Sequence, residues 1–189
     1  MVNRLHINHV LLAVMATLLA TFVALGSAAD RSEAAQCKGA DTPAFKMDAS
    51  AARKATLCLV NKERASHHLD ALHLNGDQQE AATRHNELMV DKHCFSHQCS
   101  GEPDIIGRLE QSGYLPCNCT WSIAENIAYG SADTSSPRSI FEAWMGSSAH
   151  RINIMSNQFE AVGIGIDSGS PEGGGDQAAT YTMDFGYKN

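Results

Sequence analysis

The sequence has no concentration of positive charge. Its 14 Lys and Arg residues are outnumbered by 21 Asp and Glu residues, which gives a formal net charge of −7 at pH 7. The basic residues are scattered along the chain and form no run. Because nucleic-acid binding relies on clustered Lys and Arg that neutralise phosphates, we expect no nucleic-acid partner.

The common motifs of enzyme active sites are also missing. The sequence contains no G-x-S-x-G nucleophile elbow, no H-E-x-x-H zinc motif, no phosphate-binding loop and no dinucleotide fingerprint. All six cysteines can be assigned to disulfides, which disfavours a thiol nucleophile. The motifs therefore identify no complete catalytic set and favour a protein that is not an enzyme.

Long apolar segments are absent after the N-terminus. The first residues combine Arg4, an apolar run over 10–25 and small residues over 27–29, which is the order of a secretory signal peptide. The run is also short for a bilayer span, which needs about 20 apolar residues. We predict a signal peptide over residues 1–29 and a secreted, extracellular protein. The alternative is an uncleaved leader, which would be its only contact with a membrane.

The cysteines all follow the leader, and an even number of them in an oxidising compartment predicts up to three disulfides. Pairs with the spacings C-x4-C and C-x-C superficially resemble a four-cysteine zinc site, but common zinc knuckles place two residues between paired cysteines. We expect disulfides instead, either between these two loops or within each. The pairing stays open among Cys37, Cys58, Cys94, Cys99, Cys117 and Cys119.

Helical patterns dominate the first three quarters of the chain after a polar arm over residues 30–50. A D-x-x-E capping box at Asp77 marks the second helix, and His85 falls on the apolar side of that helix, as a core histidine would. Prolines at the first turn mark the last two. The predicted helices span residues 50–69, 77–92, 103–113 and 135–147.

The C-terminal quarter changes to the period of two that strands have. Residues 161–167 and 179–187 alternate apolar residues with small or polar ones. A glycine-rich connection between them is typical of an antiparallel pair. Helices followed by strands predict one α+β domain.

The segment HCFSHQC at residues 93–99 raises the question of a functional site. We expect His93 to lie exposed at a helix end, which leaves His97 as the candidate in this segment. His150 stands just after the fourth predicted helix. Glu125 is flanked by isoleucines and alanines, and a carboxylate in an apolar run tends to be buried with a partner or to lie at a site. The alternative for Glu125 is an exposed turn.

Five blocks of sequence occur here in the same order as in one family. The chain resembles the CAP superfamily (cysteine-rich secretory proteins, antigen 5, pathogenesis-related 1), whose module is the SCP domain, and its H-R-x-N-I stretch is similar to the bacterial branch. The resemblance covers residues 55–187. The blocks are LVNKERA (59–65), RHNELMVDKHCFSH (84–97), AENIAYG (124–130), AWMGSSAHRINIMSNQFEAVGIGI (143–166) and YTMDFG (181–186).

This resemblance implies an α–β–α sandwich in which helices pack on a small antiparallel sheet with a central cleft. It also implies that two histidines and acidic residues face each other across the cleft, where several members bind a divalent metal. Carried over by motif, the cleft residues are His97, Glu125 and His150, and the metal ligands are His97 and His150, with zinc as the expected ion. Many eukaryotic members carry a second glutamate where this sequence has Ser147; Glu142 lies about 200° around the helix from Trp144.

The resemblance implies a secreted, non-catalytic binding module whose cleft holds a divalent metal, a lipid, a peptide or another component of the cell envelope. A metal-assisted hydrolase of the peptidase kind is the alternative, with Glu125 as general base beside the two histidines. A purely structural envelope protein is the third possibility.

Overall fold

The computed structural model of the chain describes residues 37–115, 119–173 and 175–189. The chain divides into two units, Met1–Lys38 and Gly39–Asn189. The predicted signal peptide over residues 1–29 lies outside the described residues, and all helices and strands given below belong to the second unit. Across the described ranges, no helix is both long and apolar enough to cross a membrane.

The second unit consists of helices and four strands that alternate along the chain. The four predicted helices are present, and α7 follows the last of them directly. The α-helices are α3 (Ala49–Ser66), α4 (Gly76–Asp91), α5 (Ile105–Gln111), α6 (Pro137–Gly146) and α7 (Ser148–Ile154), with short 3₁₀ turns η1 (Ala44–Lys46) and η2 (Ala132–Ser135). The strands are β1 (His73–Leu74), β2 (Trp121–Ser131), β3 (Ala161–Ser168) and β4 (Ala178–Lys188).

The strands form one sheet in the order β1-β3-β4-β2. The two predicted C-terminal strands, β3 and β4, are antiparallel, and β4 is also antiparallel to β2, with Glu125 directly opposite Asp184. The two-residue strand β1 pairs in parallel with β3, so the sheet is mixed rather than wholly antiparallel. Strand β2 was not predicted as a strand, because its apolar run shows no clear alternation.

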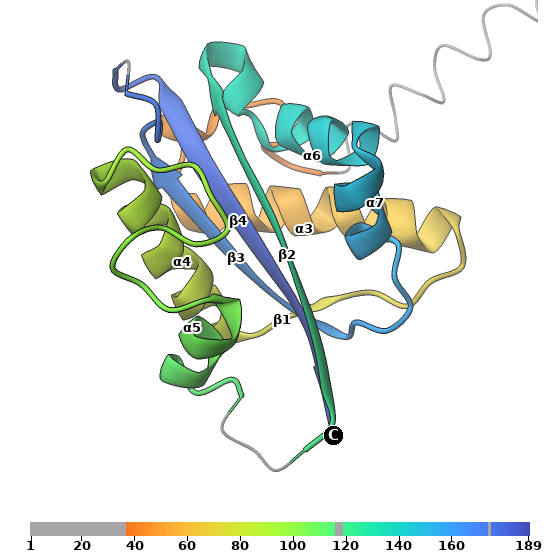
Figure 1. The fold of residues 1–189 in the computed structure, drawn as a ribbon. Coiled ribbons are helices and arrows are strands. Elements are labelled where there is room, and N and C mark those ends of the chain that lie inside the picture. The colour runs from red at the N-terminus through yellow and green to blue at the C-terminus, as the bar shows by residue number, and fades with distance from the viewer. Residues whose placement is uncertain (1–36, 116–118, 174) are drawn as a thin grey trace, which may run out of the picture. The chain divides into compact units, whose positions relative to one another are not determined.

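Helices cover both faces of the sheet, as Figure 1 shows. Helices α4 and α5 lie on one face, and α3, α6 and α7 lie on the other. The predicted α+β class and the α–β–α sandwich are therefore confirmed.

The larger hydrophobic core fills the space between the sheet and helices α3, α6 and α7. Strand β4 contributes Tyr181, Met183 and Phe185 to it, all fully buried. The indole of Trp144 meets the ring of Tyr181 edge-on at 6.4 Å and donates its N–H to the carbonyl of Ile127 at 3.2 Å. A buried tryptophan with its N–H satisfied contributes both apolar area and orientation, so α6 is fixed against the outer strand β2.

The opposite face of the sheet is polar, and α4 approaches it closely. Gly163 and Gly165 of β3 lie directly under this helix, where a Cβ on Gly163 would come 2.1 Å from the main-chain carbon of Gln78. The amide of Asn86 donates to the carbonyl of Thr180 at 2.9 Å. Glycine on the strand and hydrogen bonds from the helix together fix α4, and with it the loop that carries His97.

The local signals at the helix starts are partly as predicted. Ser136 caps α6 and Pro137 occupies its first turn, as expected. Asp77 does not cap the second helix: α4 begins one residue earlier, and the side chain of Asn75 accepts from the amide of Gln78 at 3.0 Å. Asn75 is as good a cap as Asp, and the extended piece before the helix places it at the correct position.

Part of the polar arm packs on the domain. Ala40 and Ala44 are buried, and Ala44 joins the larger core. The carbonyl of Ala40 accepts from the main-chain amide of Arg138 at 2.9 Å. Residues 39–48 thus contribute to the second unit, although their sequence shows no helical or strand pattern.

The close approach of α4 to β3 predicts the effect of adding a methyl group there. Gly163→Ala is expected to lower the free energy of unfolding by about 3 kcal/mol, because backbone rather than a flexible side chain stands in the way. Gly76→Ala is the matched control: nothing lies within 4 Å of its Cβ, so stability should stay unchanged or rise by about 0.5 kcal/mol. Urea denaturation measures both, and equal stability of the two variants would contradict the packing.

Candidate functional site

A disulfide closes the loop that follows α4. Cys94 and Cys99 are bonded, with their Cα atoms 6.0 Å apart, so the cysteines of HCFSHQC close this loop locally. Cys37, Cys58 and Cys119 are also disulfide-bonded, and none of the described cysteines is free. Cys94, Cys99 and Cys119 are therefore engaged in disulfides and not in a zinc site, while Cys117 lies outside the described residues. The closed loop holds His97 near the sheet.

Glu125 lies in the middle of β2 with its side chain buried on the polar face of the sheet. One carboxylate oxygen lies 2.7 Å from Nδ1 of His97, and the other accepts from the guanidinium of Arg108 at 2.5 Å. The alternative of an exposed turn glutamate is therefore wrong. Burial opposes the charged form of Glu125, but the bond to His97 and the charge of Arg108 outweigh it and lower the pKa of this carboxyl.

His97 lies at the solvent-facing end of this network, and 60% of its side chain is exposed. Since an ionised Glu125 only accepts hydrogen bonds, Nδ1 of His97 must donate its proton. This directs the other ring nitrogen, Nε2, away from Glu125. The hydrogen bond to Glu125 raises the pKa of His97, against the effect of its partial burial.

His150 lies in the first turns of α7, half-buried at the same site. Its carbonyl accepts from the side chain of Asn126 at 3.0 Å, and Asn153 donates to Asn126 at 2.8 Å, which ties α7 to β2. Burial lowers the pKa of His150, and the nearby charge of His97 lowers it further. The fold thus brings the three predicted residues together, although they are 25 to 53 positions apart in the chain.

Arg108 was not predicted, and it is the centre of the buried network. Only 5% of its side chain is exposed. Besides Glu125, its guanidinium donates to the carbonyl of His97 at 2.9 Å and lies 3.7 Å from the carboxylate of Glu102. One cation therefore fixes both the carboxylate that orients His97 and the backbone that carries it.

Glu102 and His85 extend the network under the disulfide loop. Glu102 accepts from the main-chain amide of Cys99 at 2.7 Å and from Nδ1 of His85 at 3.0 Å. Burial lowers the pKa of His85, so this ring is neutral near pH 7. His85 is a buried histidine with a partner, as its place on the apolar side of the predicted helix indicated.

Asp184 supplies the last buried carboxyl, directly opposite Glu125 on β4. Two ionised carboxylates cannot share such a site without a large penalty. Burial and the charge of Glu125 raise the pKa of Asp184 well above its usual range. The protonated form of Asp184 is accordingly favoured in the folded protein.

The sequence contained a signal for one of these additional residues and none for the other. Asp184 stands among apolar residues of an alternating strand, at a position that faces the same way as Thr182 and Thr180. A buried strand with an acid on its polar face indicates a partner. Arg108 looks like an ordinary surface residue of a short amphipathic helix, and only the packing of α5 buries it.

The metal ligands expected from the sequence are two imidazoles, those of His97 and His150. Within the residues that the structure describes, no group of three or more His, Cys, Asp or Glu side chains is arranged to hold a metal. Both oxygens of Glu125 are engaged, and the side chain that lines an adjoining groove at position 147 is a serine, not a carboxylate. His150 lies near enough to His97 for the charge of that ring to lower its pKa, and Glu125 orients His97.

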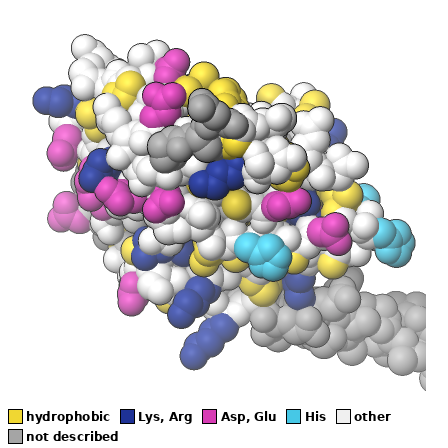
Figure 2. Space-filling model, turned by 90° about the horizontal axis from the view of Figure 1, so that it is seen from below, with side chains coloured by type: hydrophobic (Ala, Val, Ile, Leu, Met, Phe, Trp, Pro, Cys, Tyr) yellow, Lys and Arg dark blue, Asp and Glu magenta, His cyan; other side chains and the backbone are white. Residues whose placement is uncertain are grey.

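A groove of about 460 Å³ adjoins His150 along the outer side of β2. Its wall is formed by Phe95 from the disulfide loop and by Trp144 and Ser147 from α6 and its end. Its volume is within the range of small-ligand sites. On the face seen in Figure 2, acidic and basic side chains are interspersed and form no basic patch.

Comparison with known proteins agrees with the fold. The model of the cysteine-rich secretory protein family (CAP) matches residues 57–185. Two proteins of Bacillus subtilis (strain 168) are similar in sequence. The uncharacterized protein YkwD is 32% identical over 124 residues, which are 64% of this chain and 45% of YkwD, and the uncharacterized membrane protein YlbC is 28% identical over 137 residues, 72% of this chain and 38% of YlbC. The match thus spans less than half the length of either relative.

Solved structures share the fold at low sequence identity. An outer surface protein of Borrelia burgdorferi has a TM-score of 0.63 at 14% identity, with 76% of this chain and 97% of that chain covered. An extracellular SCP-domain protein of Bacillus anthracis has a TM-score of 0.57 at 22% identity, with 74% and 43% covered.

The buried charge network predicts a large effect of removing its cation. Arg108→Met leaves Glu125 and Glu102 without their cation, so the free energy of unfolding should fall by about 3–5 kcal/mol. Arg84→Met, which breaks an exposed pair with Glu80, is the control and should cost at most about 0.5 kcal/mol. Adding Glu125→Gln to Arg108→Met should recover part of the loss in urea denaturation. No recovery would show that the two residues are not coupled.

The neutral state of Asp184 predicts a pH dependence. In the unfolded chain this carboxyl loses its proton near pH 4, whereas the folded protein keeps it to higher pH, so its contribution to stability falls as pH rises above about 4. Asp184→Asn has no proton to lose and nearly the same shape. The stability of the variant relative to wild type should therefore rise between pH 4 and pH 8, measured by urea denaturation. Asp133→Asn, at an exposed position, should show no such trend, and a relative loss at pH 8 in Asp184→Asn would mean that Asp184 is ionised.

Proposed function

The chain belongs to the cysteine-rich secretory protein (CAP) family, and on this premise we propose that it is a secreted binding module whose cleft takes a divalent cation between His97 and His150. The observation that carries the proposal is the hydrogen bond between Glu125 and Nδ1 of His97, which leaves Nε2 of His97 for a ligand. The ring of His150 is near enough for the charge of His97 to lower its pKa. The cation is a component of a binding site, and a molecule in the adjoining groove completes it.

Secretion is supported by two independent features. The leader has the order of a signal peptide, and the described cysteines are oxidised, as in proteins of oxidising compartments. The matched Borrelia protein is described as an outer surface protein, and the Bacillus anthracis protein as extracellular. These descriptions are consistent with export of this chain.

The two histidines differ in how readily each ring binds a proton, with which a cation must compete. The lowered pKa of His150 keeps this imidazole neutral near pH 7, with a nitrogen lone pair available. His97 has a raised pKa, so a cation competes with a proton for its Nε2. Two imidazoles, one of them protonated more readily, suit a weak site that strengthens with rising pH.

The hydrolase alternative requires Glu125 to take a proton from water. Both oxygens of Glu125 are engaged by His97 and Arg108, and its pKa is lowered. A general base near neutral pH needs a pKa close to the working pH and a free oxygen within reach of the water. The geometry therefore favours a role for Glu125 in orienting His97, and it favours binding over hydrolysis.

Zinc titration calorimetry on the protein from residue 30 onward tests the proposal. Wild type should bind one zinc ion in the micromolar range, and His97→Ala/His150→Ala should lose this site. The matched control is His67→Ala/His73→Ala, which removes two exposed histidines outside the cleft and should bind as wild type does.

Two results would contradict the proposal. Absence of zinc binding to wild type, or equal binding by the cleft variant, rejects the cation site. Turnover of peptide or ester substrates that a chelator abolishes, and that the cleft variant lacks, would favour the hydrolase instead.

A further inference from the structure

Along the outer edge of β2, the main-chain hydrogen-bonding groups are left unpaired at Tyr129 among the described residues; we call this position the gap. Strand β2 is the last strand of the sheet, so one side of its main chain has no strand beside it. On β4, the carbonyl of Gly186 bonds the amide of Glu160 on the β3 side. Main-chain groups alternate in direction along an antiparallel pair, so the residues of β2 opposite even-numbered residues of β4 point outward. These are Glu125, Ile127 and Tyr129.

Side chains cover this edge on both sides of Tyr129. Trp144 donates to the carbonyl of Ile127 at 3.2 Å, and Asn153 reaches the carbonyl of the residue two positions before it. At the other end, the amide of Ser131 donates to the hydroxyl of Thr134 at 3.0 Å. Among the described residues, no hydrogen bond engages the outward amide and carbonyl of Tyr129. An unpaired edge of this kind accepts a further extended segment.

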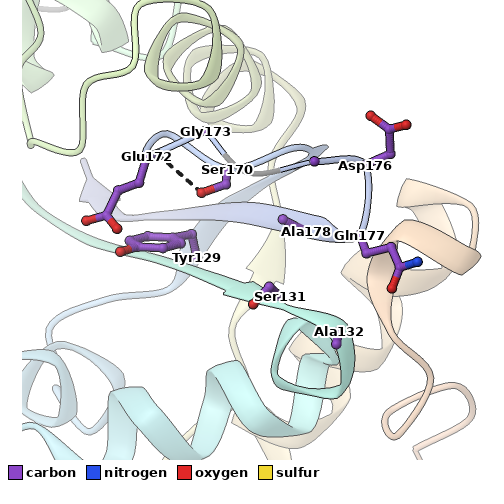
Figure 3. A pocket seen from close by; sticks show the side chains of 10 residues that line it. Tyr129, Ser131, Ala132, Ser170, Glu172, Gly173, Asp176, Gln177 and Ala178 are labelled. Atoms are coloured by element: carbon purple, nitrogen blue, oxygen red, sulfur yellow. Dashed lines mark hydrogen bonds between the residues drawn. The ribbon is translucent and has the colours of Figure 1, made fainter.

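The gap opens into the groove described above. Tyr129 contributes to that groove together with Phe95, Trp144 and His150. A second hollow, of about 580 Å³, lies between β2 and the connection from β3 to β4, and it also contains Tyr129 and Ser131. Figure 3 shows this second hollow. Tyr129 therefore stands where two adjoining hollows meet, with a free main-chain donor and acceptor.

The side chain of Tyr129 has an acidic and an aromatic neighbour. Its ring meets the ring of Phe95 edge-on at 4.9 Å. The carboxylate of Glu172 lies beside the Tyr129 ring, as Figure 3 shows, and its hydrogen bond to the hydroxyl raises the pKa of this tyrosine. Aromatic faces next to a carboxylate suit the guanidinium of arginine or the ammonium of lysine.

We propose that the groove binds an extended peptide segment whose backbone pairs with Tyr129 and whose basic side chain lies against Tyr129 and Phe95 and reaches Glu172. Directly paired residues direct their side chains to the same face of a sheet. The ligand residue opposite Tyr129 therefore projects towards Glu172, and its neighbour in the ligand projects towards the side of α6. The inference rests on the proposed function only in that the cleft binds a ligand; it needs no metal.

A purely apolar ligand fits this surface less well. A lipid chain lying over Tyr129 would cover the free amide and carbonyl without replacing their hydrogen bonds to water, which is unfavourable. The chain also carries an excess of acidic residues, which favours a basic partner. A lipid ligand is therefore an outcome of the test that would overturn the proposal.

Titration of the ¹⁵N-labelled protein by NMR, with EDTA present, tests the peptide. The probe is acetyl-Val-Ala-Arg-Ala-Val-amide, and amide shifts should centre on Tyr129 and its neighbours in β2. Replacing the Arg of the probe by Glu should weaken binding about 10-fold or more. Methylating the amide nitrogen of that Arg removes one main-chain donor and should weaken binding by a similar factor.

Variants of the protein separate the two parts of the site. Glu172→Gln should weaken binding of the Arg probe about 5- to 10-fold and should not weaken binding of the Glu probe, since repulsion of its carboxylate is removed. Glu87→Gln, on the exposed side of α4, is the charge-matched control and should bind as wild type does. Tyr129→Leu removes the ring and should weaken binding, whereas Tyr129→Phe keeps it and should bind the probe nearly as well. The spectrum of each free variant verifies its fold.

Three results would overturn the inference. Equal affinity for the Arg and Glu probes would contradict the subsite for a basic side chain. Unchanged affinity for the N-methylated probe would contradict the backbone pairing. Absence of any peptide shifts, together with shifts in the groove on adding a short-chain fatty acid, replaces the peptide by a lipid. Zinc binding without peptide pairing rejects only this inference, whereas peptide pairing without zinc binding rejects only the cation site.

Discussion

The buried pair of Arg108 and Glu125 is the interaction on which the cleft depends. A carboxylate in the middle of a sheet is stable only if a charge or several donors replace the water it loses. Arg108 supplies that charge and also holds the carbonyl of His97, so the same cation orients the acid and positions the loop. Burial and the charge of Glu125 raise the pKa of Asp184, which favours its protonated form. The polar face of the sheet is thus a neutralised network rather than an open acidic site, and His97 is the member of it that reaches solvent.

This network exists because α4 lies unusually close to the sheet. Two glycines on β3 remove the side chains that would otherwise separate helix and strand, and Asn86 and Gln78 bond to carbonyls of β4. The disulfide-closed loop that follows α4 then places His97 within hydrogen-bonding distance of Glu125. On the other face, Trp144 fixes α6 to the outer strand by its ring nitrogen. Each histidine of the cleft is therefore held by a different layer of the sandwich, and the groove at Tyr129 lies where those layers leave the edge of β2 uncovered.

The proposed binding role follows from how the site is built. The carboxylate of Glu125 is engaged by His97 and Arg108, and the pKa values of the two imidazoles are shifted in opposite directions. Among the described residues, no group of three or more His, Cys, Asp or Glu side chains is arranged to hold a metal. The open edge beside the site offers main-chain hydrogen bonds to any extended backbone, and Glu172 adds a preference for positive charge. Affinity would then come from the backbone and selectivity from one side chain, which is the usual division in strand addition.

Much of this protein is determined by its sequence alone. Hydrophobic periods of 3.6 and 2 marked four helices and the two C-terminal strands, because these patterns are local, and the ordered blocks indicated the family and the residues His97, Glu125 and His150. Strand β2 had no clear alternation, since only a few of its side chains face water, and Asn75 rather than Asp77 caps α4. The burial of Arg108, the raised pKa of Asp184 and the unpaired main-chain groups of Tyr129 were decided only by the tertiary structure. Each of them depends on which segments, far apart in the chain, come to lie against one strand, and no local pattern records that.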